Sequence, residues 1–342
     1  VVSPETLTGV DSVQYAGDMT YQALQDYPVG GIVFAKDNID SSSQFGTMTD
    51  NLQSYSEDIS GLPLFLAAAE EGGNASVLGN NDNLDEYYEN SYSDDDSDYS
   101  SSSANSVHSG ATSMSEIGRK DDSTNAYEAG KSIGSLMSAY GLNLDLAPVA
   151  DVLSGNSTGI GDRTFGTDAQ TVSDMALEVI RGIQEEDVNA AMKYFPGYGA
   201  ASSNMSGFPV INSSLDELKK KEFLPYSNAI AQGLDFVMVG HISVPNVTGD
   251  DTPASLSEKM ISEVLRKDLG FKGIVMTDYL NDKTIVKNYG AADAAVKAIQ
   301  AGLIFCLNRM IWKQPTKAYS RQLRKEISQR IAWMNLFTEF SE

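Results

Sequence analysis

Asp278 is the residue of this sequence best placed to do chemistry. It stands near the end of GIVMTDYL, Gly273–Leu280, an apolar, β-branched stretch that is too short for a buried helix and is typical of a covered parallel strand. Ligands meet α/β sheets at the carboxyl ends of their strands, so a carboxylate there can act as a catalyst. An aspartate after a strand can also form a turn or cap a helix. Position alone leaves both roles open.

Further apolar stretches predict the strands that would surround Asp278. Most are separated by segments with apolar residues at helical spacing, as in 123–140 and 169–185. Seven such units fit a (β/α)₈ TIM-type barrel better than an open sheet, with the first strand truncated and Val1-Val2 as its remnant. The predicted strands are Gly30–Ala35, Pro63–Ala69, Leu142–Ala147, Asn189–Phe195, Asp235–Ile242, Gly273–Asp278 and Leu303–Leu307.

Two serines mark the starts of further predicted helices. Ser214 with Glu217 three residues later forms a capping box, which predicts a helix that runs to about Gly233. Ser257 is expected to cap another helix, which should end at Gly270. Both helices lie between predicted strands, as the barrel requires.

Residues 80–112 interrupt the alternation of strands and helices. This segment is dense in Ser, Asp and Asn without an apolar period, which predicts a solvated, flexible acidic insertion in one domain that covers residues 1–342. Its DDDSD run could offer oxygen ligands to calcium. The spacing lacks the glycine and terminal glutamate of an EF-hand loop, so a plain acidic loop is the preferred interpretation.

The bulk composition excludes several classes of protein. A formal charge of −23, from 47 acidic and 24 basic residues, argues against nucleic-acid and anionic membrane partners. No apolar run approaches membrane-spanning length, which predicts a soluble protein. Cys306 is the single cysteine, which excludes an intrachain disulfide and a cysteine-based metal site. The opening VVSPETL has no basic, apolar leader, so we expect any export signal to be removed or absent.

Several short motifs follow one another along the chain in a distinctive order. They are VGGIVF, EEGG at Glu70–Gly73, APVADV, DRTFG at Asp162–Gly166, KYFPGYG at Lys193–Gly199, GHISVP, PASLS at Pro253–Ser257, GIVMTDYL and AIQAG. Together they resemble glycoside hydrolase family 3, in its single-domain β-N-acetylhexosaminidase branch. The resemblance extends from the first residues to about Leu307 and implies a TIM-type barrel that acts on carbohydrate.

The resemblance also implies roles for individual residues. Asp278 occupies the position of the nucleophile, which forms a glycosyl-enzyme intermediate in retaining chemistry. Arg163 and Lys193 match residues that bind sugar hydroxyls, and we expect Tyr194 and His241 to lie with them at the substrate. A structural role beside the barrel mouth is the alternative for His241.

Other positions depart from the family pattern. The family has histidines where this chain has Tyr194 and Tyr198. Its acid/base histidine and the aspartate that orients it align with Ser206 and Asn204. Three further polar positions are apolar in this chain, at Ala69, Val77 and Ile304.

Loss of the acid/base group predicts slow or absent catalysis, because general acid–base assistance contributes about 10²–10⁴-fold. Glu71 is the best surrogate acid/base among the residues that remain. The other histidine, His108, falls in the acidic insertion and is expected to be a solvated bystander.

Two functions follow from these motifs. The first is a retaining hydrolase for terminal β-linked N-acetylglucosamine, in a glycan or cell-wall fragment, with weak or lost activity and with no metal or organic cofactor. The second is an inactive sugar-binding or interaction scaffold of the same fold. An unrelated phosphate-binding barrel ranks behind both, since no glycine-rich phosphate loop occurs late in the chain. The resemblance favours the bacterial envelope or exterior over the cytoplasm.

Overall fold

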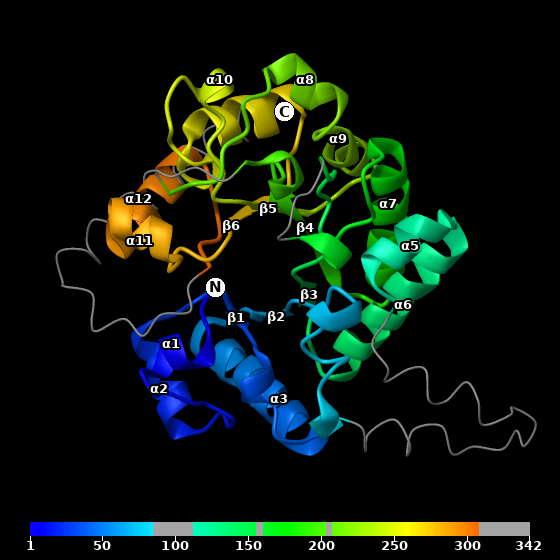
Figure 1. Cartoon of the computed structure of the whole chain (residues 1–342). Coiled ribbons are helices and arrows are strands. Elements are labelled where there is room, and N and C mark those ends of the chain that lie inside the picture. The colour runs from blue at the N-terminus through cyan, green and yellow to red at the C-terminus, as the bar shows by residue number, and fades with distance from the viewer. Residues whose placement is uncertain (85–111, 155–159, 203–206, 308–342) are drawn as a thin grey trace, which may run out of the picture.

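Six parallel strands form one curved sheet in the computed structural model, which describes residues 1–84, 112–154, 160–202 and 207–307. Each strand pairs with the next along the chain, so all carboxyl ends meet at one edge. Figure 1 shows the helices outside this sheet. The strands are β1 (Gly31–Val33), β2 (Phe65–Ala68), β3 (Leu144–Asp145), β4 (Asn189–Phe195), β5 (Phe236–Val239) and β6 (Ile274–Thr277).

Single bridges extend the sheet at both edges. Val2 forms a parallel bridge with Ile32 of β1, and Phe305 forms one with Met276 of β6. The Val1 nitrogen donates to the Cys306 carbonyl oxygen at 3.1 Å, which joins these flanking segments. The predicted TIM-type architecture is therefore confirmed as a barrel-like parallel α/β fold, in which the expected last strand, Leu303–Leu307, is reduced to a bridge.

Alternate strand residues face two separate apolar clusters. One set points into the barrel and includes Val33, Ala67 and Met276, while their neighbours Ile32, Leu66 and Val275 face the helices. Phe65, Phe236 and Phe305 fill the barrel interior with ring centroids 5.3–6.4 Å apart. This alternation determines which side chains reach the barrel mouth beyond each strand end.

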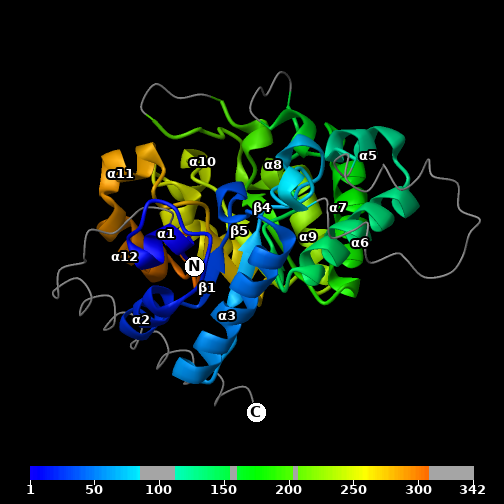
Figure 2. The ribbon, with the colours of Figure 1, turned by 90° about the horizontal axis from the view of Figure 1, so that it is seen from below.

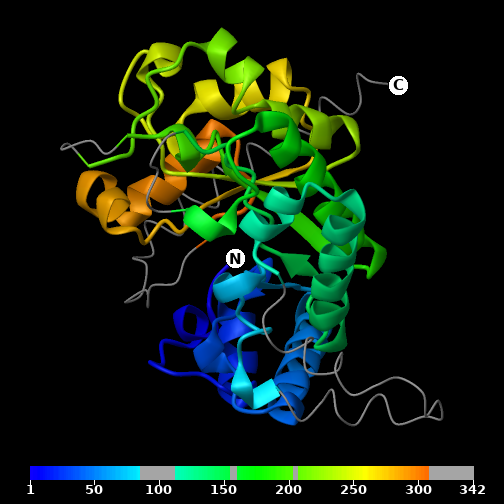
Figure 3. The same cartoon turned by 45° about the vertical axis from the view of Figure 1, so that its right-hand side comes forward.

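The helices predicted at 123–140 and 169–185 are confirmed as α6 and α7. Figures 2 and 3 show α3 along the first strands and α6 beside α7, the pair of helices with the most extensive contact. Close packing of these two depends on glycine, because a Cβ at Gly130 would lie 2.2 Å from the Val179 carbonyl oxygen. The long helices are α3 (Ser42–Ser60), α6 (Ser123–Ala139), α7 (Ala169–Glu185) and α12 (Ala291–Ala301), with α2 at Asp18–Asp26.

The helix predicted from Ser214 to Gly233 is instead two helices, α8 (Leu215–Lys220) and α9 (Leu224–Ala231). Pro225 lies in the first turn of α9, where its missing N–H costs no helical hydrogen bond, whereas a continuous helix would lose one there. The capping box at Ser214 is confirmed. The segment after Ser257 is a π-helix, Lys259–Asp268. Four short helices were not predicted: α1 (Pro4–Thr8), α5 (Met114–Lys120), α10 (Pro245–Thr248) and α11 (Lys283–Tyr289).

Several predicted features lie outside the described residues. They include most of the 80–112 insertion, with DDDSD and His108, and the Asn204–Ser206 element. Within the described ranges, no helix is both long and apolar enough to cross a bilayer. The same ranges contain no group of three or more His, Cys, Asp and Glu side chains arranged to hold a metal ion.

Candidate active site

Asp278 follows β6 directly, at the carboxyl edge of the sheet. Its backbone N–H donates to the Val239 carbonyl oxygen at 2.9 Å, which extends the pairing of β6 with β5 by one residue. Its Oδ1 accepts the N–H of Tyr279 at 2.8 Å. Asp278 is two residues beyond Met276, whose side chain lies inside the barrel, so strand alternation directs the carboxylate to the same side.

A cavity of about 500 Å³ opens beside this carboxylate. Its volume suits a small ligand such as a sugar ring. The cavity combines aromatic rings with polar groups from the segments that follow β4, β5 and β6. Its lining residues are Tyr198, Gly207, Phe208, Pro209, His241, Asp278, Tyr279, Asn281, Asp282 and Thr284.

Tyr198 connects the cavity wall to Asp278. Its phenol oxygen lies 3.5 Å from Asp278 Oδ2 and accepts the backbone N–H of His241 at 2.9 Å. Burial, followed by the nearby Asp278 charge, holds the pKa of Tyr198 well above its usual value. The phenol therefore stays protonated and can donate its hydrogen toward Asp278.

Asp151 holds the backbone of Tyr198 in place. This buried carboxylate accepts the Tyr198 N–H through Oδ2 at 3.0 Å, and its Oδ1 has no hydrogen-bond partner among the described residues. Burial raises the pKa of Asp151 to about 7, although backbone N–H groups of Tyr194 and Tyr198 oppose the shift. Asp151 thus fixes the turn that carries Tyr198.

A second group of polar side chains, the Glu71 network, consists of Glu71, Arg163, Lys193 and Tyr194. Arg163 binds both oxygens of Glu71, with Nε–Oε2 at 2.6 Å and Nη2–Oε1 at 2.7 Å. Lys193 Nζ lies 2.5 Å from Oε1, and Arg163 Nη2 also donates to the Tyr194 hydroxyl at 2.7 Å. Glu71 and Lys193 are almost fully buried, with 4% and 3% of their side chains exposed, against 32% for Arg163.

Electrostatics fix the charges in the Glu71 network. Burial alone would raise the pKa of Glu71, but Lys193 and Arg163 outweigh it and hold that pKa below its ordinary value. Burial would likewise lower the pKa of Lys193, and the Glu71 charge instead holds it above its ordinary value. All three groups are therefore ionised at neutral pH.

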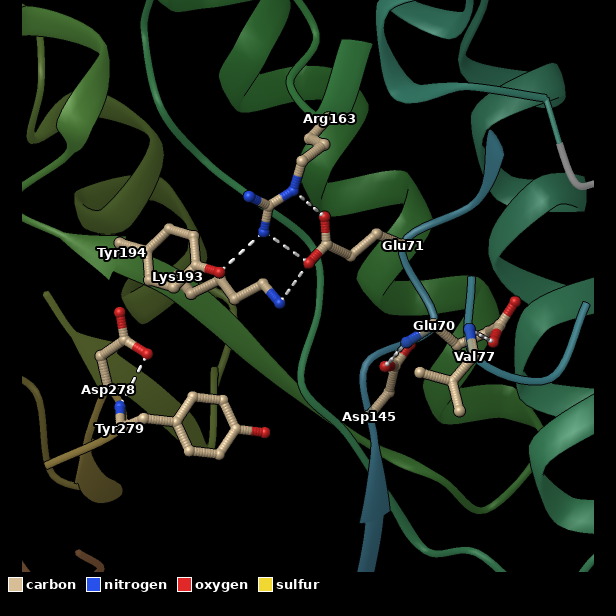
Figure 4. A network of polar contacts seen from close by, with 9 residues as sticks. All are labelled: Glu70, Glu71, Val77, Asp145, Arg163, Lys193, Tyr194, Asp278 and Tyr279. Atoms are coloured by element: carbon tan, nitrogen blue, oxygen red, sulfur yellow. Dashed lines mark hydrogen bonds and ion pairs between the residues drawn. The ribbon is translucent and has the colours of Figure 1, made fainter. Parts of the chain in front are cut away.

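Glu70, the neighbour of Glu71, points the other way and orders a loop. Its carboxylate accepts the N–H groups of Val77, Leu78 and Gly79 at 2.8–3.2 Å. The Glu70 N–H donates to Asp145 Oδ1 at 2.9 Å. Figure 4 shows Glu70 and Asp145 apart from the Glu71 network.

The residues predicted for the site fall into two groups. Asp278 and His241 line the cavity, whereas Arg163, Lys193, Tyr194 and Glu71 do not. In Figure 4, Tyr194 lies between the Arg163 guanidinium and the Asp278 carboxylate. Burial raises the pKa of Tyr194, and the Asp278 charge raises it further against the opposing charge of Lys193. The Tyr194 ring packs edge-on against the ring of Tyr198, with centroids 5.2 Å apart, and so connects the two groups.

Three positions noted for their apolar residues have varied surroundings. Ala69 follows β2 and packs against the apolar cluster inside the barrel. Val77 belongs to the loop that Glu70 holds. Ile304 is 45% exposed, and its N–H donates to the Val275 carbonyl oxygen at 2.9 Å. No side chain at these positions can donate or accept a hydrogen bond.

Sequence reasoning did not assign Tyr198, Asp151, Phe208 or Asp282 to the site. Tyr198 was noticeable only as a replacement for a family histidine. Asp151 stands at the end of the predicted strand in APVAD, the same kind of position that identified Asp278. Phe208 and Asp282 carry no comparable signal, since each lies in a connecting segment.

The fold and the site define a TIM-barrel-like α/β protein with a carboxylate beside a cavity at the carboxyl ends of its strands. Comparison with protein families identifies the class further. The model described as "Glycosyl hydrolase family 3 N terminal domain" matches residues 105–331, most of the chain. The chain belongs to this family.

Individual relatives agree with this assignment. Beta-hexosaminidase A of Pseudoalteromonas piscicida is 25% identical over 300 residues, which cover 84% of this chain and 46% of the relative. The chain thus spans about half the length of this relative. A family 3 β-N-acetylglucosaminidase structure from Paenibacillus sp. FPU-7 is 29% identical at a TM-score of 0.75, covering 91% of this chain and 53% of the other. A family 3 member from Mycobacterium smegmatis is 29% identical at a TM-score of 0.72, with coverages of 95% and 88%.

Proposed function

We propose that this chain carries a retaining glycosidase site for terminal β-linked N-acetylglucosamine, with Asp278 as the nucleophile and with weak or lost turnover. One observation carries the proposal: Asp278 stands at the end of β6 and lines a cavity large enough for a sugar ring. Family membership supports the reaction class, and the names of relatives, which include β-N-acetylglucosaminidase, support the sugar.

The first chemical step follows from the contacts of Asp278. Oδ1 accepts the Tyr279 N–H, while Oδ2 has the longer contact with Tyr198. An oxygen of the carboxylate attacks the anomeric carbon, and the bond to the leaving oxygen breaks with its electron pair. This forms a glycosyl ester of Asp278, which water then hydrolyses.

Protonation of the leaving group is the weak point of this site. The Tyr198 phenol lines the cavity, but its raised pKa makes it a poor acid. Glu71, the predicted surrogate, is held ionised by Lys193 and Arg163, and the ionised form has no proton to give. We therefore do not assign Glu71 the acid role and propose that it orients the two cations instead.

A substrate with a very good leaving group tests the role of Asp278. A dinitrophenyl β-N-acetylglucosaminide needs little acid assistance, so we expect a burst of dinitrophenolate and one glycosyl group on the peptide that contains Asp278, seen by mass spectrometry. Asp278→Asn should abolish both signals.

Asp168→Asn is the matched control for this assay. It makes the same change of charge at an exposed helix cap that accepts the N–H groups of Gln170 and Thr171, and asparagine caps helices about equally well. This control should be labelled like the parent. Labelling that persists in Asp278→Asn would remove Asp278 from the mechanism.

The alternative is an inactive sugar-binding or interaction scaffold. It is favoured by the Glu71 network, in which Arg163 and Lys193 are already engaged with Glu71, and by the apolar side chain at Ala69. Saturable binding of N-acetylglucosamine without labelling would support the scaffold. If the protein showed no sugar binding and no labelling, both functions would be contradicted.

A further inference from the structure

We propose that His241 is a positioning residue that fixes both partners of Asp278, its neighbour Tyr279 and the facing phenol of Tyr198. His241 follows β5 and lines the cavity, and only 5% of the residue is exposed. The inference rests on the proposed function, in which Asp278 is the nucleophile. It gives His241 a role other than sugar binding or proton transfer.

The imidazole of His241 holds the backbone beyond the nucleophile. Its Nε2 lies 3.0 Å from the Tyr279 carbonyl oxygen. A carbonyl oxygen only accepts, so Nε2 must carry the hydrogen of this bond. On the other side, Nδ1 lies 2.7 Å from Ser255 Oγ, and in the neutral ring the hydroxyl donates to Nδ1. The Tyr279 carbonyl oxygen thereby selects the tautomer with hydrogen on Nε2, and Ser255 donates to the nitrogen that this leaves without hydrogen.

The backbone of His241 orients the second partner. Its N–H donates to the Tyr198 phenol oxygen at 2.9 Å. While that oxygen accepts from His241, its own hydrogen can be donated to Asp278 Oδ2, at 3.5 Å. Asp278 is thus contacted by the N–H of Tyr279 at Oδ1 and by Tyr198 at Oδ2, and His241 holds both contacting residues.

Four separate segments meet at this residue. Tyr198 follows β4, Tyr279 follows β6, and Ser255 belongs to the 3₁₀ turn Ala254–Leu256. Both ring nitrogens of His241 are occupied, so the ring can transfer no proton to a leaving group without breaking one of these bonds. A small displacement of a nucleophile can cost about 10²-fold in rate, which makes such a clamp consequential.

NMR tests the tautomer without relying on activity. The chain has two histidines, so His108→Gln leaves His241 as the single imidazole. A long-range ¹H–¹⁵N spectrum of this variant should show hydrogen on Nε2. A ring with hydrogen on Nδ1 alone could not donate to the Tyr279 carbonyl and would overturn the proposal even if Asp278 proved unreactive.

Labelling by the dinitrophenyl glycoside tests the effect on Asp278. His241→Phe keeps the size of the ring but has no donor, and it should lower the saturating labelling rate about 10²-fold with little change in the half-saturating concentration. His241→Gln places an amide N–H near the position of Nε2 and should recover most of that rate. Equal losses in the two variants, after thermal unfolding shows both to be folded, would overturn the proposal.

A parent that shows no labelling would count against the proposed function alone. The tautomer in the His108→Gln spectrum would still show whether the ring donates to Tyr279. The two failures can therefore be told apart.

Discussion

The Glu71 network and the Asp278 cavity lie next to each other, yet they use charge in opposite ways. Glu71 is buried and has two cationic partners, whose nitrogens lie 2.5–2.7 Å from its carboxylate oxygens. Asp278 borders an open cavity and accepts from one backbone N–H at 2.8 Å and one phenol at 3.5 Å. Both oxygens of Glu71 are thus engaged by cations, whereas Asp278 Oδ2 has only the long phenol contact among the described residues.

At this end of the barrel, the Glu71 network is therefore suited to stabilising the fold and the Asp278 cavity to chemistry. Buried charges are tolerated only when they are paired, so we expect the ion pairs of the Glu71 network to be needed for the stability of the fold. A nucleophile needs the reverse, a carboxylate with an accessible oxygen beside an open volume. The contrast makes predictions about stability that can be measured independently of any substrate.

Removing Glu71 should have the largest effect on stability. Glu71→Ala leaves Lys193 buried without its partner and Arg163 without its bidentate acceptor. Breaking a buried pair from one side typically costs about 3–5 kcal/mol. Denaturant unfolding would measure this loss.

Glu178→Ala is the matched control, because Glu178 pairs with Arg181, whose side chain is 65% exposed. Exposed pairs contribute about 0–1 kcal/mol. A loss as small for Glu71→Ala as for this control would show that the network does not support the fold.

Asp151, which carries the Tyr198 turn next to the cavity, should make stability depend on pH. Its pKa is about 7 in the folded chain, against an ordinary 3.8. Between these pH values the folded protein keeps a proton that the unfolded chain has lost, so the free energy of unfolding falls as pH rises, by up to about 1.4 kcal/mol per pH unit. Above about pH 7 this contribution levels off.

Asp151→Asn should remove this dependence. Between pH 4 and pH 7, the free energy of unfolding of the parent should fall by about 2–4 kcal/mol more than that of the variant. Parallel curves for the two proteins would show that Asp151 is already ionised in the fold at low pH.

The third effect concerns one cation of the Glu71 network. Lys193→Met removes a buried ammonium group but leaves Glu71 bound through both oxygens by Arg163. No carboxylate oxygen loses its last partner, so the expected cost is about 1–2 kcal/mol, less than for Glu71→Ala. Thermal unfolding of Lys193→Met and Glu71→Ala side by side tests this order. A greater loss of stability for Lys193→Met would show that the network depends more on Lys193 than on Glu71.

Local sequence signals predicted the scaffold well because they depend on neighbouring residues. Asn189–Phe195 and Ala169–Glu185 were predicted with the bounds that the structure has. One exception is the Ser214–Gly233 helix, where Pro225 interrupts an otherwise helical pattern, and another is Leu303–Leu307, which forms a single bridge in place of a strand. The strand-end rule that singled out Asp278 is of the same local kind.

The partners within the site could not be predicted in this way. Glu71 and Arg163 are 92 residues apart, and their pairing depends on how two loops turn after leaving their strands. Arg163 and Lys193 were therefore expected at the substrate, while Glu71 holds them beside Tyr194. The contact of Tyr198 with the His241 backbone likewise leaves no trace in the sequence.

The smallest effect on stability should come from the residue proposed to matter most for chemistry. Asp278→Asn keeps an oxygen that can accept the Tyr279 N–H, and the carboxylate it removes has no cationic partner among the residues that line the cavity. We expect the free energy of unfolding to change by no more than about 0.5 kcal/mol, in either direction, because no buried charge loses its counterion. Denaturant unfolding beside Glu71→Ala makes the comparison direct. A loss of several kcal/mol in Asp278→Asn would mean that Asp278 belongs to the structural charges after all, and the distinction between the two regions would fail.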